Sequence, residues 1–411
     1  MPSSEVWRAE TKLEVWNGGS RGKRKREKKK PLLDASPERE GETAYNNTWA
    51  LWVIPLVLSC CGIVMIASLT SRSNPDGSSP YWLASRQFVY LGLGLLLMCC
   101  CYLTPLSVVR RSSWLLWIVS VLMVFGTLIP GIGVRVGGAR RWLNLGIQFQ
   151  PLEILTLAVP LFLADRLAAS RREGLQCFCR PSFSLAMISA FPLFLQPNMG
   201  GIILVFGICM SMHVVAKGWK YPLVGALFLG AAFIGMIYME PYRIRRLLAF
   251  IDPWEDPLDR GFQIIQGLVA FSNGGILGVG VGKGLQKSNY LPAAHTDYIF
   301  PAIGEEFGLM GTLFVVTLYA IWTVKSYSIY RRSDDLYISI LIWGVTVSIL
   351  FPMFVNFGGV MKLMPLTGIP LPFLSSGGTA LVFMWVKVGV LMRIEKELAL
   401  RNRNLPGGLR A

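Results

Sequence analysis

The sequence lacks the cysteine and histidine spacing of a disulfide framework or a structural zinc site. Six of its eight cysteines lie inside apolar stretches, where cysteine acts as a small apolar filler: Cys60, Cys61, Cys99, Cys100, Cys101 and Cys209. Cys177 and Cys179 have no second cysteine or histidine pair nearby, so a tetrahedral zinc site would lack ligands. The cysteines therefore indicate neither redox chemistry nor zinc.

A nucleotide-binding loop and a secretory leader are also missing. The stretch GVGVGKG, Gly278 to Gly284, fails as a Walker A motif because Leu277 and Gly284 stand where glycine and Ser or Thr are required. The charged segment up to Asn47 has no apolar signal-peptide core and is predicted to be disordered. Its basic run, Arg21 to Lys30, favours contact with anionic lipid over nucleic acid, because a membrane span follows.

What the sequence does have is a series of long hydrophobic runs. Hydrophobic residues make up 53% of the chain, the mean hydropathy is +0.48 and the formal charge is +16, a combination typical of polytopic membrane proteins. About ten runs approach the ~20 residues that cross a bilayer: Trp49–Thr70, Phe88–Leu103, Trp114–Ile132, Leu152–Ala168, Ser182–Leu195, Gly201–Ala216, Tyr221–Met239, Phe307–Val324, Leu336–Val355 and Thr379–Met392. Short alternating barrel segments are absent, so we expect an all-α polytopic integral membrane protein.

The distribution of basic residues predicts the orientation of these spans. An even number of spans places both termini on one side, together with most of the basic loop residues, and by the positive-inside rule that side is cytoplasmic. The expected divisions are a basic cytoplasmic tail at 1–48, one transmembrane domain at 49–395 and a cytoplasmic tail at 396–411. A long extracytoplasmic loop, Glu240 to Thr296, precedes the eighth span.

The first polar cluster on the outer side runs from Gly137 to Glu153, GGARRWLNLGIQFQPLE. Arg140 and Arg141 lie on the side that the positive-inside rule depletes of basic charge, and guanidinium groups match phosphate oxygens with a bidentate fork. An interfacial turn that pairs lipid phosphates explains the two arginines equally well. Glu153 begins a span, and a carboxylate there is usually functional or paired.

Three further clusters follow along the chain. LQPNMGG, Leu195 to Gly201, is either a tight turn or a cavity lining. The segment from Arg243 to Asp297 contains outward arginines, a predicted helix at Phe262 to Phe271, and acidic residues that either form turns beside prolines or bind a cation. The last cluster, Asn356 to Gly378, is broken by proline and glycine and either packs as a re-entrant segment or approaches a ligand closely.

Taken in order, these motifs resemble the SEDS family, whose members include FtsW, RodA and SpoVE. The resemblance covers Trp49 to about Arg393 and rests on GGARRWLNLG, QPLE, QPNMG, RRLLAFIDPWEDP, GFQIIQ, GGILGVGVG, QKSNYLPAAHTDYIF, GEEFGL and LTGIPLPFLSSGG. The sequences of these motifs are more similar to the division branch, FtsW, than to the elongation branch, RodA. Four positions depart from the family pattern: Leu152, Thr156, Asn198 and Ala293 replace the usual Ser, Lys, Asp and Glu.

The resemblance implies a peptidoglycan glycosyltransferase that polymerises lipid II at the outer face of the bacterial cytoplasmic membrane, during septal cell division. Asp297 matches the family's essential aspartate and is the candidate general base. The candidate substrate-binding residues lie in the same motifs: Arg140, Arg141, Gln150, Glu153, Arg245, Arg246, His295, Thr296, Lys362 and Ser375. The implied partners are a class B penicillin-binding protein and other division proteins.

Several alternatives stay open from the sequence. Asp297 is also a favoured residue type for the N-cap of the helix that follows it. An elongation-type polymerase, a flippase for lipid-linked sugars and a division scaffold without chemistry would share the predicted topology. No cofactor is certain, and a divalent cation, Mg²⁺ or Mn²⁺, is a candidate.

Overall fold

The computed structural model describes residues 49–71, 79–136, 139–144, 146, 148–172, 182–219, 241–285 and 291–403, together with 222–223, 225–227, 230 and 235. The predictions for the N-terminal tail, for Cys177 and Cys179, for most of the span at Tyr221–Met239 and for the end of the C-terminal tail therefore fall outside the described residues.

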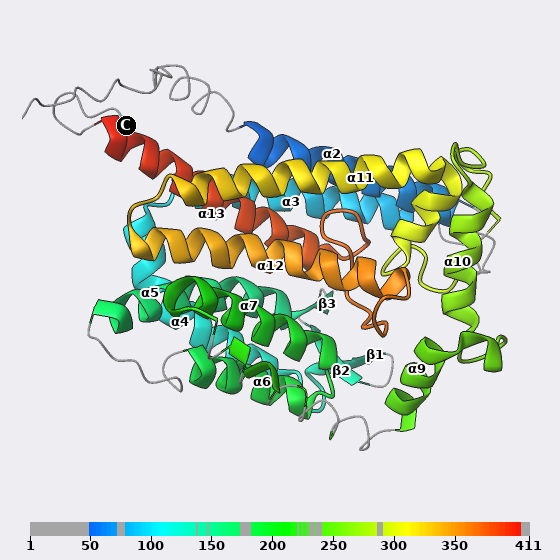
Figure 1. Ribbon diagram of the computed structural model, residues 1–411, viewed down its shortest axis with the longest axis horizontal. Coiled ribbons are helices and arrows are strands. Elements are labelled where there is room, and N and C mark those ends of the chain that lie inside the picture. The colour runs from blue at the N-terminus through cyan, green and yellow to red at the C-terminus, as the bar shows by residue number, and fades with distance from the viewer. Residues whose placement is uncertain are drawn as a thin grey trace, which may run out of the picture.

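Helices make up most of the described chain (Figure 1). They are α2 (Trp49–Thr70), α3 (Trp82–Leu103), α4 (Leu106–Gly126), α5 (Pro151–Arg172), α6 (Ser184–Leu195), α7 (Met199–Lys217), α9 (Pro241–Ile251), the 3-10 turn η2 (Pro253–Glu255), α10 (Phe262–Gly274), α11 (Ile299–Arg331), α12 (Leu336–Val360) and α13 (Gly378–Arg403). Six of the described helices, α2, α3, α4, α7, α11 and α12, are long and apolar enough to cross a membrane. The mainly helical membrane fold is confirmed, and the number of about ten spans stays a prediction.

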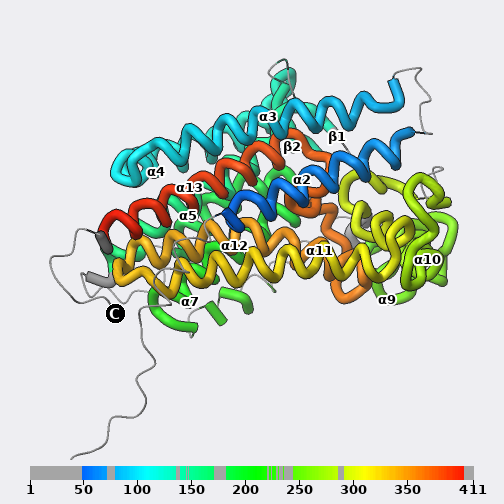
Figure 2. The backbone as a smooth tube through the Cα atoms, turned by 90° about the horizontal axis from the view of Figure 1, so that it is seen from above, coloured from blue at the N-terminus to red at the C-terminus, as the bar shows by residue number. Residues whose placement is uncertain are grey.

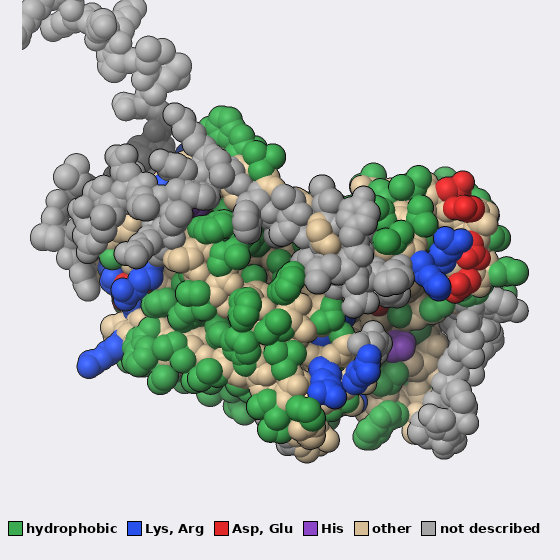
Figure 3. Space-filling view, turned by 90° about the horizontal axis from the view of Figure 1, so that it is seen from below, with side chains coloured by type: hydrophobic (Ala, Val, Ile, Leu, Met, Phe, Trp, Pro, Cys, Tyr) green, Lys and Arg blue, Asp and Glu red, His purple; other side chains and the backbone are tan. Residues whose placement is uncertain are grey.

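The long helices run roughly alongside one another, and α9 and α10 lie together at one end of the molecule (Figures 1 and 2). Helix α5 packs against α4, α7 and α12, whereas α13 packs chiefly against α3 and also contacts α5 and α12. Leu155 of α5, Val345 of α12 and Trp385 of α13 are all fully buried. On the face in Figure 3, hydrophobic side chains cover a broad area and acidic side chains gather at the end that holds α9 and α10.

Several helix boundaries predicted from hydropathy are wrong, and a small sheet was not predicted. Helix α3 begins at Trp82 rather than Phe88, and α4 is Leu106–Gly126 rather than Trp114–Ile132, because helices continue through polar and charged residues that a hydropathy window rejects. The segment expected as an outer loop forms an antiparallel sheet of β1 (Gly133–Val136), β2 (Ala139–Asn144) and β3 (Gln148–Phe149), in that order.

Helix α11 is broken at Gly308, whose backbone has φ 65° and ψ −160°. The glycine-rich segment after α10 supplies backbone partners on both sides of the break. The amides of Val279 and Gly280 donate to the carbonyls of Glu305 and Glu306, both at 3.0 Å, and the amide of Leu309 donates to the carbonyl of Gly275 at 2.9 Å. Backbone groups that the break removes from the helix are thereby satisfied.

Candidate functional site

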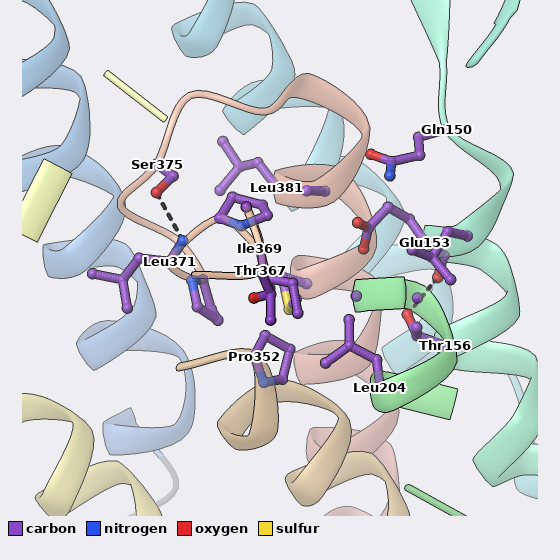
Figure 4. Close-up of a pocket in the computed structure, with 18 of the residues that line it drawn as sticks. Gln150, Glu153, Thr156, Leu204, Pro352, Thr367, Ile369, Leu371, Ser375 and Leu381 are labelled. Carbon is purple, nitrogen blue, oxygen red and sulfur yellow. Dashed lines mark hydrogen bonds between the residues drawn. The ribbon is translucent and has the colours of Figure 1, made fainter. Parts of the chain in front are cut away.

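A mostly apolar pocket with a few polar side chains lies where four helices meet one irregular segment (Figure 4). Its walls come from the start of α5, the start of α7, Pro352 of α12, the segment 367–375 and the first turns of α13. In Figure 4, Gln150, Glu153 and Thr156 stand on one side, and Thr367, Ile369 and Ser375 come from the irregular segment. Irregular backbone at membrane depth is tolerated where it lines a cavity or is buried in protein.

Ser375 fixes the shape of the irregular segment. Its hydroxyl accepts a hydrogen bond from the Leu371 amide at 2.8 Å and donates to the Thr296 carbonyl at 2.5 Å. The Ser375 carbonyl accepts from Nε2 of Gln87 at 3.1 Å. Ser375 is therefore both a pocket-lining residue and the link between the pocket wall and the chain that carries Asp297.

Asp297 lies directly beside this pocket wall. Nδ2 of Asn356 donates to the carbonyl of Asp297 and to the carbonyl of the pocket-lining Ile369, both at 2.8 Å. A Cβ atom on the pocket-lining Gly368 would lie 3.8 Å from Oδ2 of Asp297, so the carboxylate lies next to a lining residue although it does not line the pocket itself. The side chain is half-buried, and its Oδ1 accepts from the Thr296 hydroxyl at 2.7 Å.

The structure does not use Asp297 as a helix cap. Helix α11 begins at Ile299 with Tyr298 at the N-cap position, and no side chain makes a capping hydrogen bond there. The alternative explanation of Asp297 as an N-cap is therefore wrong for this conformation. Its carboxylate needs another explanation, because a polar group this close to the core is normally bound by a partner or used in function.

Glu153 and Thr156 form the α5 side of the pocket. Glu153 is 7% exposed, and the Thr156 hydroxyl donates to the Glu153 carbonyl at 2.9 Å. Behind Thr156, Nζ of the fully buried Lys387 donates to Oγ1 of Thr156 at 3.1 Å. The lysine that the family pattern places at position 156 is thus absent from α5, and an ammonium group reaches that position from α13.

The predicted basic residues are not brought together as a set. Arg141 lines the pocket and donates to the Pro197 carbonyl at 3.4 Å. Arg246 of α9 donates to the Leu366 carbonyl at 3.1 Å, next to the pocket segment. Arg141 is therefore at the pocket and Arg246 is beside its irregular segment, while phosphate binding by either stays a prediction.

The other three basic candidates lie elsewhere. Arg140 donates to the Leu128 carbonyl at 3.3 Å, and Lys362 donates to the Ile251 carbonyl at 3.4 Å. Arg245 is exposed on α9. None of these three side chains lines the pocket, because neighbours in a motif need not point the same way from a strand or a helix. Substrate binding by them stays a prediction.

His295 is a neighbour of the pocket segment rather than part of its lining. Its carbonyl accepts from the Ser376 amide at 2.8 Å. Burial lowers the pKa of its imidazole below the ordinary value, while the charge of Asp297 acts in the opposite direction. Burial prevails, so the neutral ring is the favoured form at neutral pH.

Two further clusters have structural explanations. Asn198 caps α7 by accepting from the Gly201 amide at 3.1 Å, and it also lines the pocket. Gln196 of the same motif does not line the pocket and donates instead to the Val124 carbonyl at 2.9 Å. In the acidic segment, Asp252 accepts from the Trp254 amide, and Asp256 pairs with Arg260 at 2.8 Å. The hydrogen bond from Arg260 lowers the pKa of Asp256. These acidic residues build turns.

Among the described residues, no three His, Cys, Asp or Glu side chains come together as a metal site. Mg²⁺ is often held by one or two carboxylates with substrate phosphates and water, and Asp297 offers one such carboxylate. A divalent cation therefore stays a prediction.

Four residues around the pocket were not identified from the sequence. Thr367 and Gly368 lie inside the motif LTGIPLPFLSSGG, whose sequence does not indicate which of its residues face a pocket. Asn356 lies before this motif and belongs to none of the motifs that carry the resemblance. Lys387 lies in a run counted simply as apolar, although a lysine inside a span is itself a signal of function or pairing.

Six described helices that are long and apolar enough to cross a membrane, one of them broken at Gly308, define a multi-pass membrane protein. The FtsW/RodA/SpoVE family model, described as a cell cycle protein, matches residues 48–400, and the chain belongs to this family. The resemblance in the motifs is thereby confirmed.

Relatives and solved structures agree with this assignment. The probable peptidoglycan glycosyltransferase FtsW of Nitrosomonas europaea is 34% identical, over 85% of this chain and 93% of that protein. The stage V sporulation protein E of Bacillus subtilis is 33% identical, over 84% and 96%.

Two solved structures are similar in fold. A chain from the structure described as coordination of polymerization and crosslinking by a peptidoglycan synthase complex matches with a TM-score of 0.69 and 28% identity, over 85% of this chain and 98% of that one. The rod shape determining protein RodA of Thermus thermophilus matches in fold with a TM-score of 0.63 and 24% identity, over 85% and 96%.

Proposed function

We propose that this protein is a peptidoglycan glycosyltransferase that polymerises lipid II into glycan strands at the outer face of the cytoplasmic membrane during septal division. The observation that carries the proposal is the position of Asp297. Its carboxylate stands next to the pocket-lining Gly368, and it caps no helix. The names of the relatives support the same activity.

In the proposed reaction, Asp297 removes the proton from the 4-hydroxyl of the acceptor sugar. The freed oxygen pair bonds to the anomeric carbon of the donor sugar, and the bond from that carbon to the undecaprenyl pyrophosphate breaks. A general base within hydrogen-bond reach contributes typically ~10²- to 10⁴-fold to such a step. In this reaction Arg141, which lines the pocket, and Arg246, which donates to the Leu366 carbonyl beside it, compensate the charge of the leaving pyrophosphate.

The test is polymerisation of purified lipid II by the purified full-length chain, with glycan strands separated by length. We expect glycan strands when the protein and a single-span class B transpeptidase are both present. We expect none from Asp297→Asn, with or without the transpeptidase. Movement of lipid II across a vesicle bilayer without polymer would instead identify a flippase. Transpeptidase binding without polymer or transport would identify a scaffold.

The proposal also requires the α9 to α11 connection to lie outside the cell. Leu258 is 87% exposed in this connection, so a cysteine placed there is accessible to solvent. In intact cells Leu258→Cys should react with a thiol reagent that does not cross membranes. Labelling that appears only after the cells are opened would place the pocket on the wrong side for this reaction.

A further inference from the structure

A buried lysine stands behind the pocket wall. Lys387 is 0% exposed in the middle of α13, and its ammonium group donates to Oγ1 of Thr156 in α5 at 3.1 Å and to the Ser348 carbonyl in α12 at 3.2 Å. One side chain thus joins three helices. It does not line the pocket itself, whereas Thr156 does.

These hydrogen bonds do not neutralise the charge of Lys387, because a hydroxyl and a carbonyl are neutral acceptors. Removing an ammonium group from water costs several kcal/mol, so a buried lysine is normally paired with a carboxylate. Glu153 is the acidic group whose charge acts on Lys387, and Lys387 is the charged group that acts on Glu153. The pair is reciprocal, and no ion pair as close as 4 Å forms between them in the described residues.

Thr156 links the Lys387 ammonium to the backbone of Glu153. It accepts from the Lys387 ammonium and donates to the carbonyl of Glu153, one helical turn earlier on α5. The carboxylate of Glu153 lines the pocket in front of this chain of bonds. Lys387 therefore acts on the pocket through Glu153 and Thr156.

We propose that Lys387 is a positioning residue for the glycosyltransferase, delivered from α13, which keeps Glu153 ionised and fixed at the pocket wall. An ionised carboxylate only accepts hydrogen bonds, so it suits the hydroxyl and amide donors of a sugar, whereas a protonated one also donates. The proposal rests on the proposed function for its effect on catalysis. The pairing itself does not depend on that function.

The sharpest test moves the lysine from one helix to the other. In Lys387→Met the ammonium is replaced by an apolar side chain that adapts to irregular space. In the double variant Thr156→Lys with Lys387→Met, the charge returns three residues from Glu153 on the same face of α5. We expect lipid II polymerisation to fall about tenfold or more in the single variant, as when a partner that orients a ligand is lost, and to recover in the double variant.

Lys396→Met is the matched control. Lys396 also belongs to α13, but its ammonium lies 4.6 Å from the ring centre of Tyr102, and it is not part of the pocket. This variant should polymerise lipid II like the unmodified protein. If Lys396→Met and Lys387→Met lost polymerisation activity equally, the loss would come from removing any positive charge from α13. The proposal would then be overturned.

Infrared spectroscopy tests the pairing without relying on activity. Lys387→Met should gain a protonated carboxylic acid band at neutral pH that the unmodified protein lacks. The band should vanish in Glu153→Gln with Lys387→Met. If Lys387→Met fails to fold, folding should return in this doubly neutral variant, because no buried charge is left unpaired.

The outcomes separate the two proposals. An unmodified protein that makes no glycan, together with the acid band in Lys387→Met, would refute the glycosyltransferase and keep the pairing. Full polymerisation by Lys387→Met, or a loss that the moved lysine does not restore and that brings no acid band, would refute the positioning role.

Discussion

Two sets of carboxylates near the N-terminal end of α11 are held very differently. Glu305 and Glu306 are each 2% exposed. Glu306 accepts from the Ser68 hydroxyl at 2.7 and 3.0 Å, and Glu305 accepts from the Leu285 amide at 3.1 Å. Asp297 is half-buried beside the pocket and accepts from its neighbour Thr296.

This difference distinguishes an acid that holds the fold together from an acid available for chemistry. The glutamates are bound by α2 and by the segment after α10, so their oxygens are committed to the protein. The Asp297 carboxylate is half-buried next to the pocket-lining Gly368 and accepts only from its sequence neighbour Thr296 among the hydrogen bonds of the described residues. In the proposed reaction Asp297 is therefore the general base, and Glu305 and Glu306 hold the fold.

The largest expected effect comes from Asp297→Asn. Asparagine is nearly the same shape and can still accept from the Thr296 hydroxyl, but it cannot take a proton. Lipid II polymerisation should fall ~10²- to 10⁴-fold at an unchanged melting temperature. Asp259→Asn, at an exposed position of the acidic segment, is the control and should leave the rate unaltered. A normal rate in Asp297→Asn would show that Asp297 is not the general base, and it would then no longer differ from Glu305 and Glu306 in having a role in the reaction.

Gly308→Ala should have the next largest effect, on stability rather than on chemistry. A side chain at φ 65° and ψ −160° costs about 1–3 kcal/mol in strain. In addition, the new Cβ would lie 2.4 Å from the Gly278 amide nitrogen. We expect a lower melting temperature and yield. The control is Gly92→Ala in α3, where no atom lies within 4 Å of an added Cβ, and which should be neutral.

Glu306→Gln should give a smaller loss of stability and spare the chemistry. It keeps one acceptor for Ser68 but removes the charge, and a hydrogen bond to a charged group contributes about 1.5–3 kcal/mol. Melting curves of Glu306→Gln, Ser68→Ala and the double variant should show that the two losses are not additive. The rate per folded molecule should stay normal. A rate loss as large as that of Asp297→Asn would give Glu306 a role in the reaction.

The smallest expected effect is a pH dependence of stability from His295. Its pKa is lowered in the folded protein, so the folded state binds fewer protons than the unfolded state. Stability should therefore be complete above the ordinary histidine pKa of about 6.5 and decline as the pH falls below it. His295→Gln should flatten this part of the melting temperature profile. Identical profiles would show that His295 does not titrate in this way.

The sequence predicted the helical membrane fold well, because long apolar runs have few other uses. It did not predict the sheet of β1 to β3, where short strands with arginines and glycines give little hydropathy signal. The break in α11 was also missed. Its motif, GEEFGL, was recognised as a family signature, but the positive φ of Gly308 depends on the segment after α10.

For the site, motifs identified which segments meet but not which way each side chain points. Arg141, Gln150, Glu153 and Ser375 line the pocket as expected. Arg140 differs because successive residues of a strand face opposite sides. Lys387 could not be linked to Glu153 from sequence distance, since α13 and α5 meet only through tertiary packing.

The glycine-rich segment between α10 and α11 will behave unlike an ordinary loop in hydrogen–deuterium exchange. Its amides at Val279 and Gly280 are bonded to the carbonyls of Glu305 and Glu306, at the break in α11. They can exchange only when that contact opens, so we expect them to be as slow as amides in a helix. Faster exchange at these two amides on binding a transpeptidase or lipid II would report that the two halves of α11 have moved apart.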